Sequence, residues 1–143
     1  MNVSVARSLP TTTSLDAPLA LLGRVGLSLI FIISGWGKIA GYAATQQYME
    51  SAGVPGGLLP LVIALELGGG LALLGGAFTR WIALALAAFS LASAALFHAN
   101  LGDAAQAINF WKNVAMAGGF LMLAAHGAGT LSVDHAWRTR RNA

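Results

Sequence analysis

The sequence predicts an all-α integral membrane protein, folded as an antiparallel bundle of four transmembrane helices. Composition is the first observation that predicts it: 57% of the 143 residues are hydrophobic and 9% are charged, whereas about 25% are charged in typical soluble domains. A soluble domain of this length buries only about 60 to 70% of its surface, so this sequence needs lipid as a second solvent. The second observation is four apolar runs, each long enough to cross a hydrocarbon core of about 30 Å as a helix of about 20 residues.

The predicted spans follow one another with short polar connections. Residues 1–16 are polar and predict a flexible cytoplasmic N-terminus, and the apolar run after them is too long for a signal-peptide core, so we expect it to remain as the first span. Residues 17–127 form one four-helix transmembrane domain, and residues 128–143 form a basic cytoplasmic tail. The predicted spans are Leu19–Ile39, Leu58–Ala77, Trp81–His98 and Ile108–His126.

Residues that start and stop helices agree with these limits. Asp16 suits the start of the first span, Gly76 the end of the second, and Thr79 is expected to cap the third. Asp103 and Gln106 form a capping box before the fourth span.

The first connection, residues 41–57, is predicted to hold a short helix on the membrane surface. Tyr42, Thr45, Met49 and Ala52 recur there at helical spacing. The basic residues then predict the orientation. Most arginines lie in the terminal segments and in the connection between the second and third spans, so the positive-inside rule places both termini in the cytoplasm.

Composition also excludes several classes of function. The net charge of +3 rests on eight basic and five acidic residues, too few for a surface that tracks phosphates, so nucleic acid is not an expected partner. The chain has no cysteine, which excludes disulfides, thiolate metal sites and cysteine nucleophiles. No metal, phosphate or nucleophile motif is present, so we assign no metal ligand, no catalytic residue and no covalently bound cofactor.

One face of the first span carries an unusual line of residues. Arg24, Ser28, Phe31, Gly35 and Lys38 recur at steps of four, three, four and three, which places them on one side of a helix. An intramembrane charge needs a partner or water. This face is therefore expected to line the interior of the bundle.

Glu66 is the one acidic residue inside a predicted span. Glu66 and Lys112 both lie about 10 Å below the outer surface, at about 1.5 Å per helical residue, so an ion pair between them is allowed. Arg24 starts from the inner side and either extends inward to lipid phosphates or climbs toward Glu66. Which base pairs with Glu66 stays open, as does whether the pair serves a function or only fixes the helix register.

The polar residues of all four spans predict one cavity in the outer half of the bundle, opening between the first and third connections. Its expected residues are Ser34, Lys38, Glu66, His98, Asn109, Lys112 and Asn113. The second span also carries a stripe of small residues nearly opposite Glu66, at a spacing of four, which lets another helix pack closely in the bundle or in an oligomer. The stripe consists of Ala64, Gly68, Ala72 and Gly76.

An ordered set of motifs resembles the DoxX family of small four-helix bacterial inner-membrane proteins, and the resemblance covers residues from about 20 to 126. The motifs are Leu22-Gly-Arg24, Ser34-Gly-Trp-Gly-Lys38, Gly53-Val-Pro55, Ala64-Leu-Glu66-Leu-Gly-Gly-Gly70, Leu74-Gly-Gly76 with Thr79-Arg80, and Lys112-Asn113. The resemblance implies a multi-pass protein of the cytoplasmic membrane. Some relatives serve as membrane subunits of quinone-linked sulfur oxidation, and others are linked to oxidative-stress or thiol-handling complexes.

Three functions remain open on this sequence. The preferred one is a membrane subunit associated with quinone-linked or stress-related redox chemistry, with a quinone as the bound molecule and a soluble redox partner that brings electrons. In this hypothesis the protein is not an enzyme on its own, and Glu66 is a suitable proton carrier. The alternatives are a small-solute transporter or channel, which four short helices would form only as a homo-oligomer, and a scaffold that recruits a cytoplasmic enzyme through the basic tail. The bilayer itself is a partner in every case.

Overall fold

The structure is a computed structural model that describes residues 15–143, and the described part is helical, with no strand. Residues 1–14 of the predicted N-terminal segment lie outside the described residues. The helices are α1 (Asp16–Ala40), α2 (Tyr42–Ser51), α3 (Leu59–Ile63), α4 (Gly69–Gly75), α5 (Thr79–Phe97), α6 (Ala104–His126) and α7 (Val133–Arg141). A 3-10 turn, η1 (Gly56–Leu58), precedes α3, and a π-helical turn, η2 (Ala64–Gly68), joins α3 to α4.

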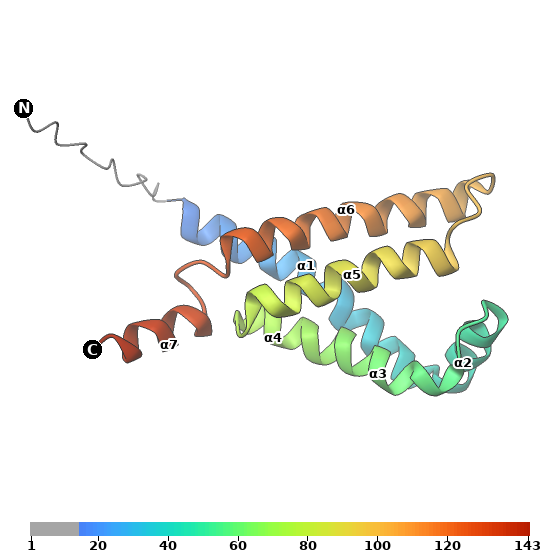
Figure 1. Ribbon diagram of the computed structural model, residues 1–143, viewed down its shortest axis with the longest axis horizontal. Coiled ribbons are helices and arrows are strands. Elements are labelled where there is room, and N and C mark those ends of the chain that lie inside the picture. Colours follow the sequence, from blue (N-terminus) through green and yellow to red (C-terminus); the bar gives the residue numbers. More distant parts are fainter. Residues whose placement is uncertain (1–14) are drawn as a thin grey trace, which may run out of the picture.

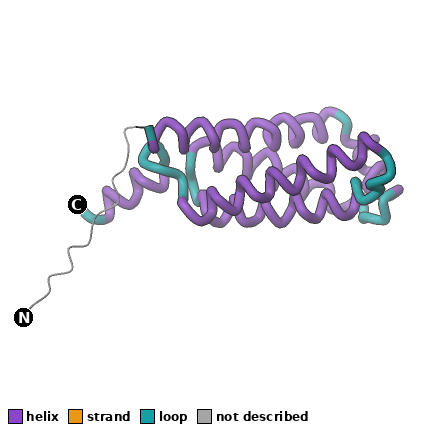
Figure 2. Tube along the Cα trace, turned by 90° about the horizontal axis from the view of Figure 1, so that it is seen from above, coloured by secondary structure: helices purple, strands orange, loops and turns teal. Residues whose placement is uncertain are grey.

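The long helices lie side by side, with the connections gathered at the two ends (Figures 1 and 2). α1 packs along η2 and α4 to form one pair of helical segments, and α5 packs along α6 to form a second pair. The two pairs contact each other through α4 with α5 and through α1 with α6. The short α2 lies where α1 ends, as Figure 1 shows, and the sequence prediction of a helix within residues 41–57 is confirmed.

Three helical segments of the described chain are long and apolar enough to cross a membrane: Asp16–Ala40, Gly56–Gly75 and Thr79–Phe97. These confirm three of the predicted spans to within a few residues. α6 has 23 residues, but its first half carries the polar residues Gln106, Asn109, Lys112 and Asn113, and it does not reach the same apolarity. The fourth span and the antiparallel order remain predictions.

α1 and the second span approach each other closely at two glycines. A Cβ at Gly35 would lie 2.8 Å from the backbone nitrogen of Leu67, and a Cβ at Gly70 would lie 2.8 Å from Cγ1 of Ile32. Any larger residue at either position would therefore force the two helices apart. The close contact brings the polar face of α1 against η2.

The core lies below this contact and joins all four long helical segments. Phe31 makes edge-to-face contacts with Phe89 and Phe120, with ring centroids 6.2 and 5.3 Å apart. Leu73 and Leu86 are fully buried beside them. The predicted interior line of α1 is confirmed, because Arg24, Ser28, Phe31 and Gly35 are its buried residues.

The small-residue stripe is not where the helices meet. Gly68 would have open space around an added Cβ, and Ala64 is exposed, so no helix of the described chain packs on the upper part of the stripe. Gly76 instead turns in the left-handed conformation beside Arg24. The close approach uses Gly70 on the other side of the same helix, because that side faces α1. Contact with a second copy through the stripe remains a prediction.

Arg24 fastens the C-terminal segment to the bundle. Its side chain donates to the backbone oxygens of Leu74 (Nε, 3.3 Å), Leu131 (Nη2, 2.8 Å) and Ala128 (Nη1). Only 2% of Arg24 is exposed. Both sequence alternatives for Arg24 are therefore wrong: it neither climbs toward Glu66 nor reaches out to lipid phosphates, because carbonyl groups at the end of the bundle already satisfy it.

Asp134 supplies the cap that was expected from Thr79. Its two carboxylate oxygens accept the backbone N–H groups of Phe78, at 2.8 Å, and Thr79, at 2.9 Å, at the start of α5. The Thr79 hydroxyl is buried beside the Asp134 carboxylate. The segment predicted as a basic tail is thus partly helical, as α7, and is held to the bundle by Arg24 and Asp134. The predicted cap by Asp103 is confirmed, since its side chain accepts from Gln106 N at 2.9 Å.

Asp134 makes the docking of α7 depend on pH. Burial raises the pKa of the Asp134 carboxyl, but hydrogen bonds from Thr79 and Phe78 and the charge of Arg138 outweigh burial, so the pKa lies below its ordinary value of 3.8. A carboxyl with a depressed pKa stabilises the fold above its ordinary pKa, and that contribution is lost as the pH falls through the lower folded value. We expect Asp134→Asn to lower the thermal midpoint at neutral pH, and the difference from wild type to shrink below about pH 3.8. A difference in thermal midpoint that stays constant as the pH falls from neutral to well below 3.8 would contradict this role.

Candidate functional site

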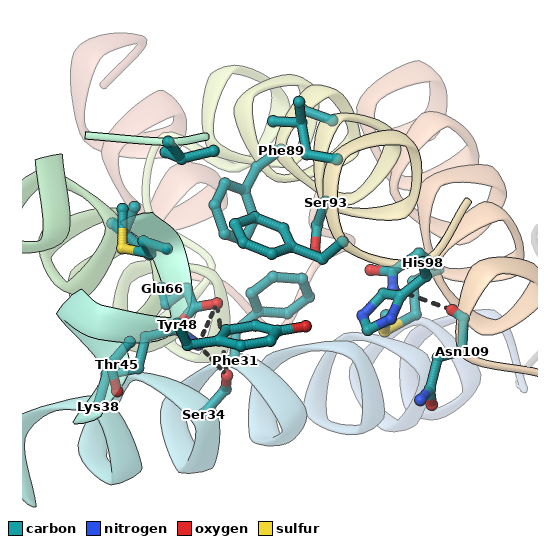
Figure 3. Close-up of a pocket in the computed structure, with 18 of the residues that line it drawn as sticks. Phe31, Ser34, Lys38, Thr45, Tyr48, Glu66, Phe89, Ser93, His98 and Asn109 are labelled. Carbon is teal, nitrogen blue, oxygen red and sulfur yellow. Dashed lines mark hydrogen bonds and ion pairs between the residues drawn. The ribbon is translucent and has the colours of Figure 1, made fainter. Parts of the chain in front are cut away.

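A cavity of about 560 Å³ lies between α1, α2, α3, η2, α5 and α6. Figure 3 shows that its side chains come from both helix pairs and from the α2 segment above them. All seven residues proposed from the sequence line this cavity: Ser34, Lys38, Glu66, His98, Asn109, Lys112 and Asn113. Arg24 does not line it, because it lies nearer the start of α1, at the junction with the C-terminal segment.

Glu66 enters the cavity wall from the π-helical turn η2 and is 3% exposed. Lys38 Nζ lies 2.8 Å from Glu66 Oε2 and donates to Oε1 at 3.0 Å. Ser34 completes the group, since its hydroxyl accepts from Lys38 Nζ at 2.7 Å and lies 3.4 Å from Glu66 Oε1. Figure 3 shows these three side chains gathered at one end of the cavity. We call them the carboxylate pole.

The partner of Glu66 is therefore neither Lys112 nor Arg24, and both sequence alternatives for it are wrong. α1 packs directly on η2, so the residue on the inner face of α1 at this depth, Lys38, reaches the carboxylate first. A π turn shifts the side chains that follow it around the helix, and such turns are frequent at functional sites. The turn has no signal in the local sequence.

Lys38 lies close to both oxygens of the Glu66 carboxylate. Oε2 is buried and lies 2.8 Å from Lys38 Nζ, and Oε1 lies 3.0 Å from the same nitrogen. The pair is therefore a buried carboxylate neutralised by one ammonium group in the wall of the cavity.

A second polar group, the amide pole, consists of His98, Gln106, Asn109, Lys112 and Asn113. His98 Nδ1 and Gln106 Oε1 lie 2.7 Å apart and share a hydrogen bond. Asn113 donates to the backbone oxygen of Asn109 at 3.0 Å. Lys112 is exposed and forms no ion pair with any described residue.

Apart from Thr45 and Ser93, the rest of the wall is apolar or aromatic. Phe31 and Phe89 line it from α1 and α5. Tyr48 stacks on Phe97, with ring centroids 5.3 Å apart and planes at 26°. These aromatic residues were not among the predicted site residues. The sequence alone does not distinguish an aromatic residue that lines a cavity from one that packs in the core or contacts lipid. The helical spacing of residues in α2 does predict which side of that helix packs inward, since Met49 on this side is buried.

The arrangement suits a molecule with an apolar ring or body and oxygen atoms that exchange hydrogen bonds. The carboxylate pole offers a donor, an ammonium group, and a carboxylate that can hold or release a proton. The amide pole offers an imidazole and further donors. Aromatic side chains between the poles would flank a planar ring.

Comparisons with known proteins identify a family and two similar bacterial proteins. A family model described as DoxX matches residues 19–99. The inner membrane protein YqjF of Escherichia coli (strain K12) is 54% identical over 114 residues, which cover 80% of this chain and 88% of the relative. The inner membrane protein YphA of the same strain is 41% identical over 123 residues, covering 81% of this chain and 88% of the relative. No solved structure matches the chain.

Proposed function

Because this chain belongs to the DoxX family, we propose that it is a multi-pass inner-membrane protein whose cavity binds a quinone headgroup for a membrane redox system. The names of both relatives support the location, since each is an inner membrane protein. In this proposal both termini face the cytoplasm, where the positive-inside rule places the arginines of α7.

α6 is the fourth span in this proposal, despite its polar first half. Asn109, Lys112 and Asn113 line the cavity, so their polar groups need not be buried in hydrocarbon. Polar residues inside a membrane are tolerated where they face a bundle interior or a cavity. The half-buried placement of Asn109 and Asn113 on the cavity wall therefore supports a span that composition alone leaves in doubt.

The observation that carries the quinone proposal is the carboxylate pole in an otherwise largely apolar chamber. Reduction of a quinone takes up two electrons and two protons, and needs donors for the carbonyl oxygens together with a group that delivers protons. Lys38 and Ser34 are positioned as donors, and Glu66 as the proton carrier. A soluble electron-transfer protein supplies the electrons, and Lys38, 24% exposed, connects the buried carboxylate with the surface.

Binding is favoured over passage of a solute. Below the cavity the bundle is filled by Phe31, Leu73, Leu86 and Phe120, all buried. A channel along the described bundle would have to pass through this packed layer, whereas a bound headgroup only needs the chamber above it. The chamber is thus better suited to hold a molecule than to conduct one.

A titration tests the proposal. Purified protein in lipid nanodiscs is titrated with a short-tailed benzoquinone, and binding is followed calorimetrically. We expect saturable binding, weakened about tenfold by Glu66→Gln, which corresponds to about 1.4 kcal/mol. Glu50→Gln on the exposed side of α2 serves as the matched control and should bind like wild type. Absence of binding by the wild-type protein, or equal binding by both variants, would overturn the proposal.

A further inference from the structure

The route into the cavity follows from which of its walls are exposed. We infer that the cavity fills sideways from the lipid, through a gap between α3 and α5, and that its ligand is a lipid with one polar headgroup and an apolar tail. This inference rests on the proposed function in one respect, namely that the cavity holds a ligand.

The end of the cavity beneath α2 is only partly covered. Tyr48 of α2 stacks on Phe97 of α5 across this end, and Met49 beside it is buried while lining the cavity. α2 is tied to the following turn, because Gln46 Nε2 donates to Gly56 O at 3.3 Å. Tyr48 is nevertheless 51% exposed and Lys38 is 24% exposed, so polar groups border this end of the cavity.

The side between α3 and α5 is open. Leu58 and Leu96 both line the cavity, yet they are 44% and 54% exposed. A side chain that lines a cavity and also faces outward marks an opening. The helix packing explains the gap: α3 packs on α1, whereas α5 makes its contacts with this half of the chain at η2 and α4, further down the bundle. Val62 and Ala92 also line the cavity from these two segments.

The opposite side, between α1 and α6, has a different character. Ile30 is exposed there as well, but the α6 wall carries Asn109, Lys112 and Asn113. An apolar tail loses nothing between leucine side chains, whereas beside amides and an ammonium group it would leave polar groups without water. The α3–α5 gap is therefore the side that fits a tail.

The ligand class follows from this geometry. A headgroup at the carboxylate pole would place its tail between Leu58 and Leu96, in contact with the acyl chains of the bilayer. The tail is isoprenoid or acyl, and the ligand arrives by diffusion within the membrane. The end of the cavity at Tyr48 and Lys38 is polar and offers a tail no comparable apolar contact.

The test uses the absence of cysteine from the natural sequence. Ser93→Cys, on the cavity wall, is labelled with a nitroxide and reconstituted in vesicles of phosphatidylethanolamine and phosphatidylglycerol without added ligand. Collision rates are measured with oxygen, which concentrates in lipid, and with a neutral nickel chelate, which stays in water. We expect oxygen collisions to dominate, and to be largely lost when Leu58→Trp and Leu96→Trp are added to fill the gap.

Matched controls are Leu61→Trp on α3 and Leu91→Trp on α5, which are exposed but do not line the cavity. They should leave the oxygen collisions unchanged. If the Ser93 variant does not fold, Val62→Cys on the facing wall replaces it. Dominant nickel collisions, or oxygen collisions that the Trp pair does not reduce, would overturn the lipid route. Because no quinone is used, the lipid route and the quinone proposal can fail independently.

Discussion

Lys38→Met is expected to destabilise the folded protein by about 3 kcal/mol, the lower end of the range for removing one partner of a buried ion pair. The reason is that Glu66, only 3% exposed, would keep a buried carboxylate with no counter-charge. The lower end applies because Lys38 itself is 24% exposed. The free energy of unfolding in mixed detergent micelles measures the effect.

A double-mutant cycle shows whether the pair is the cause. Glu66→Gln should be milder, because the remaining Lys38 ammonium can turn toward water. The double variant should be more stable than Lys38→Met alone, since it leaves no uncompensated charge. Lys112→Met is the matched control, a cavity lysine with no ion pair in the described chain. Strictly additive effects of Lys38→Met and Glu66→Gln would contradict the coupling.

Arg24→Met is expected to release the C-terminal segment and to destabilise the protein by about 3 kcal/mol or more, since each buried group left without its hydrogen bond costs roughly 1 to 3 kcal/mol. Arg24 holds the backbone oxygens of Leu74, Ala128 and Leu131 together. Arg24→Lys should restore little, because a single ammonium does not reproduce the planar fork of donors.

Hydrogen exchange of the α7 amides measures this release. Protection within residues 133–141 should be lost in Arg24→Met while the α5 and α6 amides remain protected. Arg80→Met is the control, because Arg80 is exposed and makes one long hydrogen bond, 3.4 Å, to Ala125 O. Full protection of α7 in Arg24→Met would show that the guanidinium does not hold the segment.

The helices could be predicted from the sequence because their signals are local. The three confirmed spans and the surface helix α2 follow from runs and spacings of apolar residues. The Asp103 cap follows from a polar residue before such a run. The interior face of α1 also follows, since a line of residues at steps of three and four defines one side of a helix whatever lies opposite.

The partners of the charged residues could not be predicted in the same way. Depth in the membrane placed Glu66 level with Lys112, but it does not give the direction in which a side chain points around its helix. Lys38 lies near the same end of the bundle. Because Glu66 lies in the π turn and α1 packs against that turn, Lys38 forms the ion pair with Glu66. Spacing gives the side of a helix, and only tertiary packing gives the neighbour.

The interactions that hold the C-terminal segment could not be predicted from the sequence for a related reason. Asp134 caps a helix that begins 55 residues earlier in the chain, and Arg24 binds carbonyl groups more than 100 residues later. Thr79 looked like a cap because it is the right residue at the right place. The carboxylate of Asp134 instead accepts hydrogen bonds from the backbone N–H groups of Phe78 and Thr79. No local sequence pattern predicts this contact.

Identifying the molecule that leaves the membrane with the protein tests the central claim most directly. The protein is extracted from bacterial membranes in a mild detergent, and its bound lipids are identified by mass spectrometry. Ser93→Phe serves as the comparison, because its ring would fill the cavity while the side chains of Lys38 and Glu66 stay unaltered. The account predicts nearly one mole of quinone per mole of wild-type protein. It predicts that Ser93→Phe carries no bound quinone. Equal amounts of quinone in both proteins, or none in either, would contradict it.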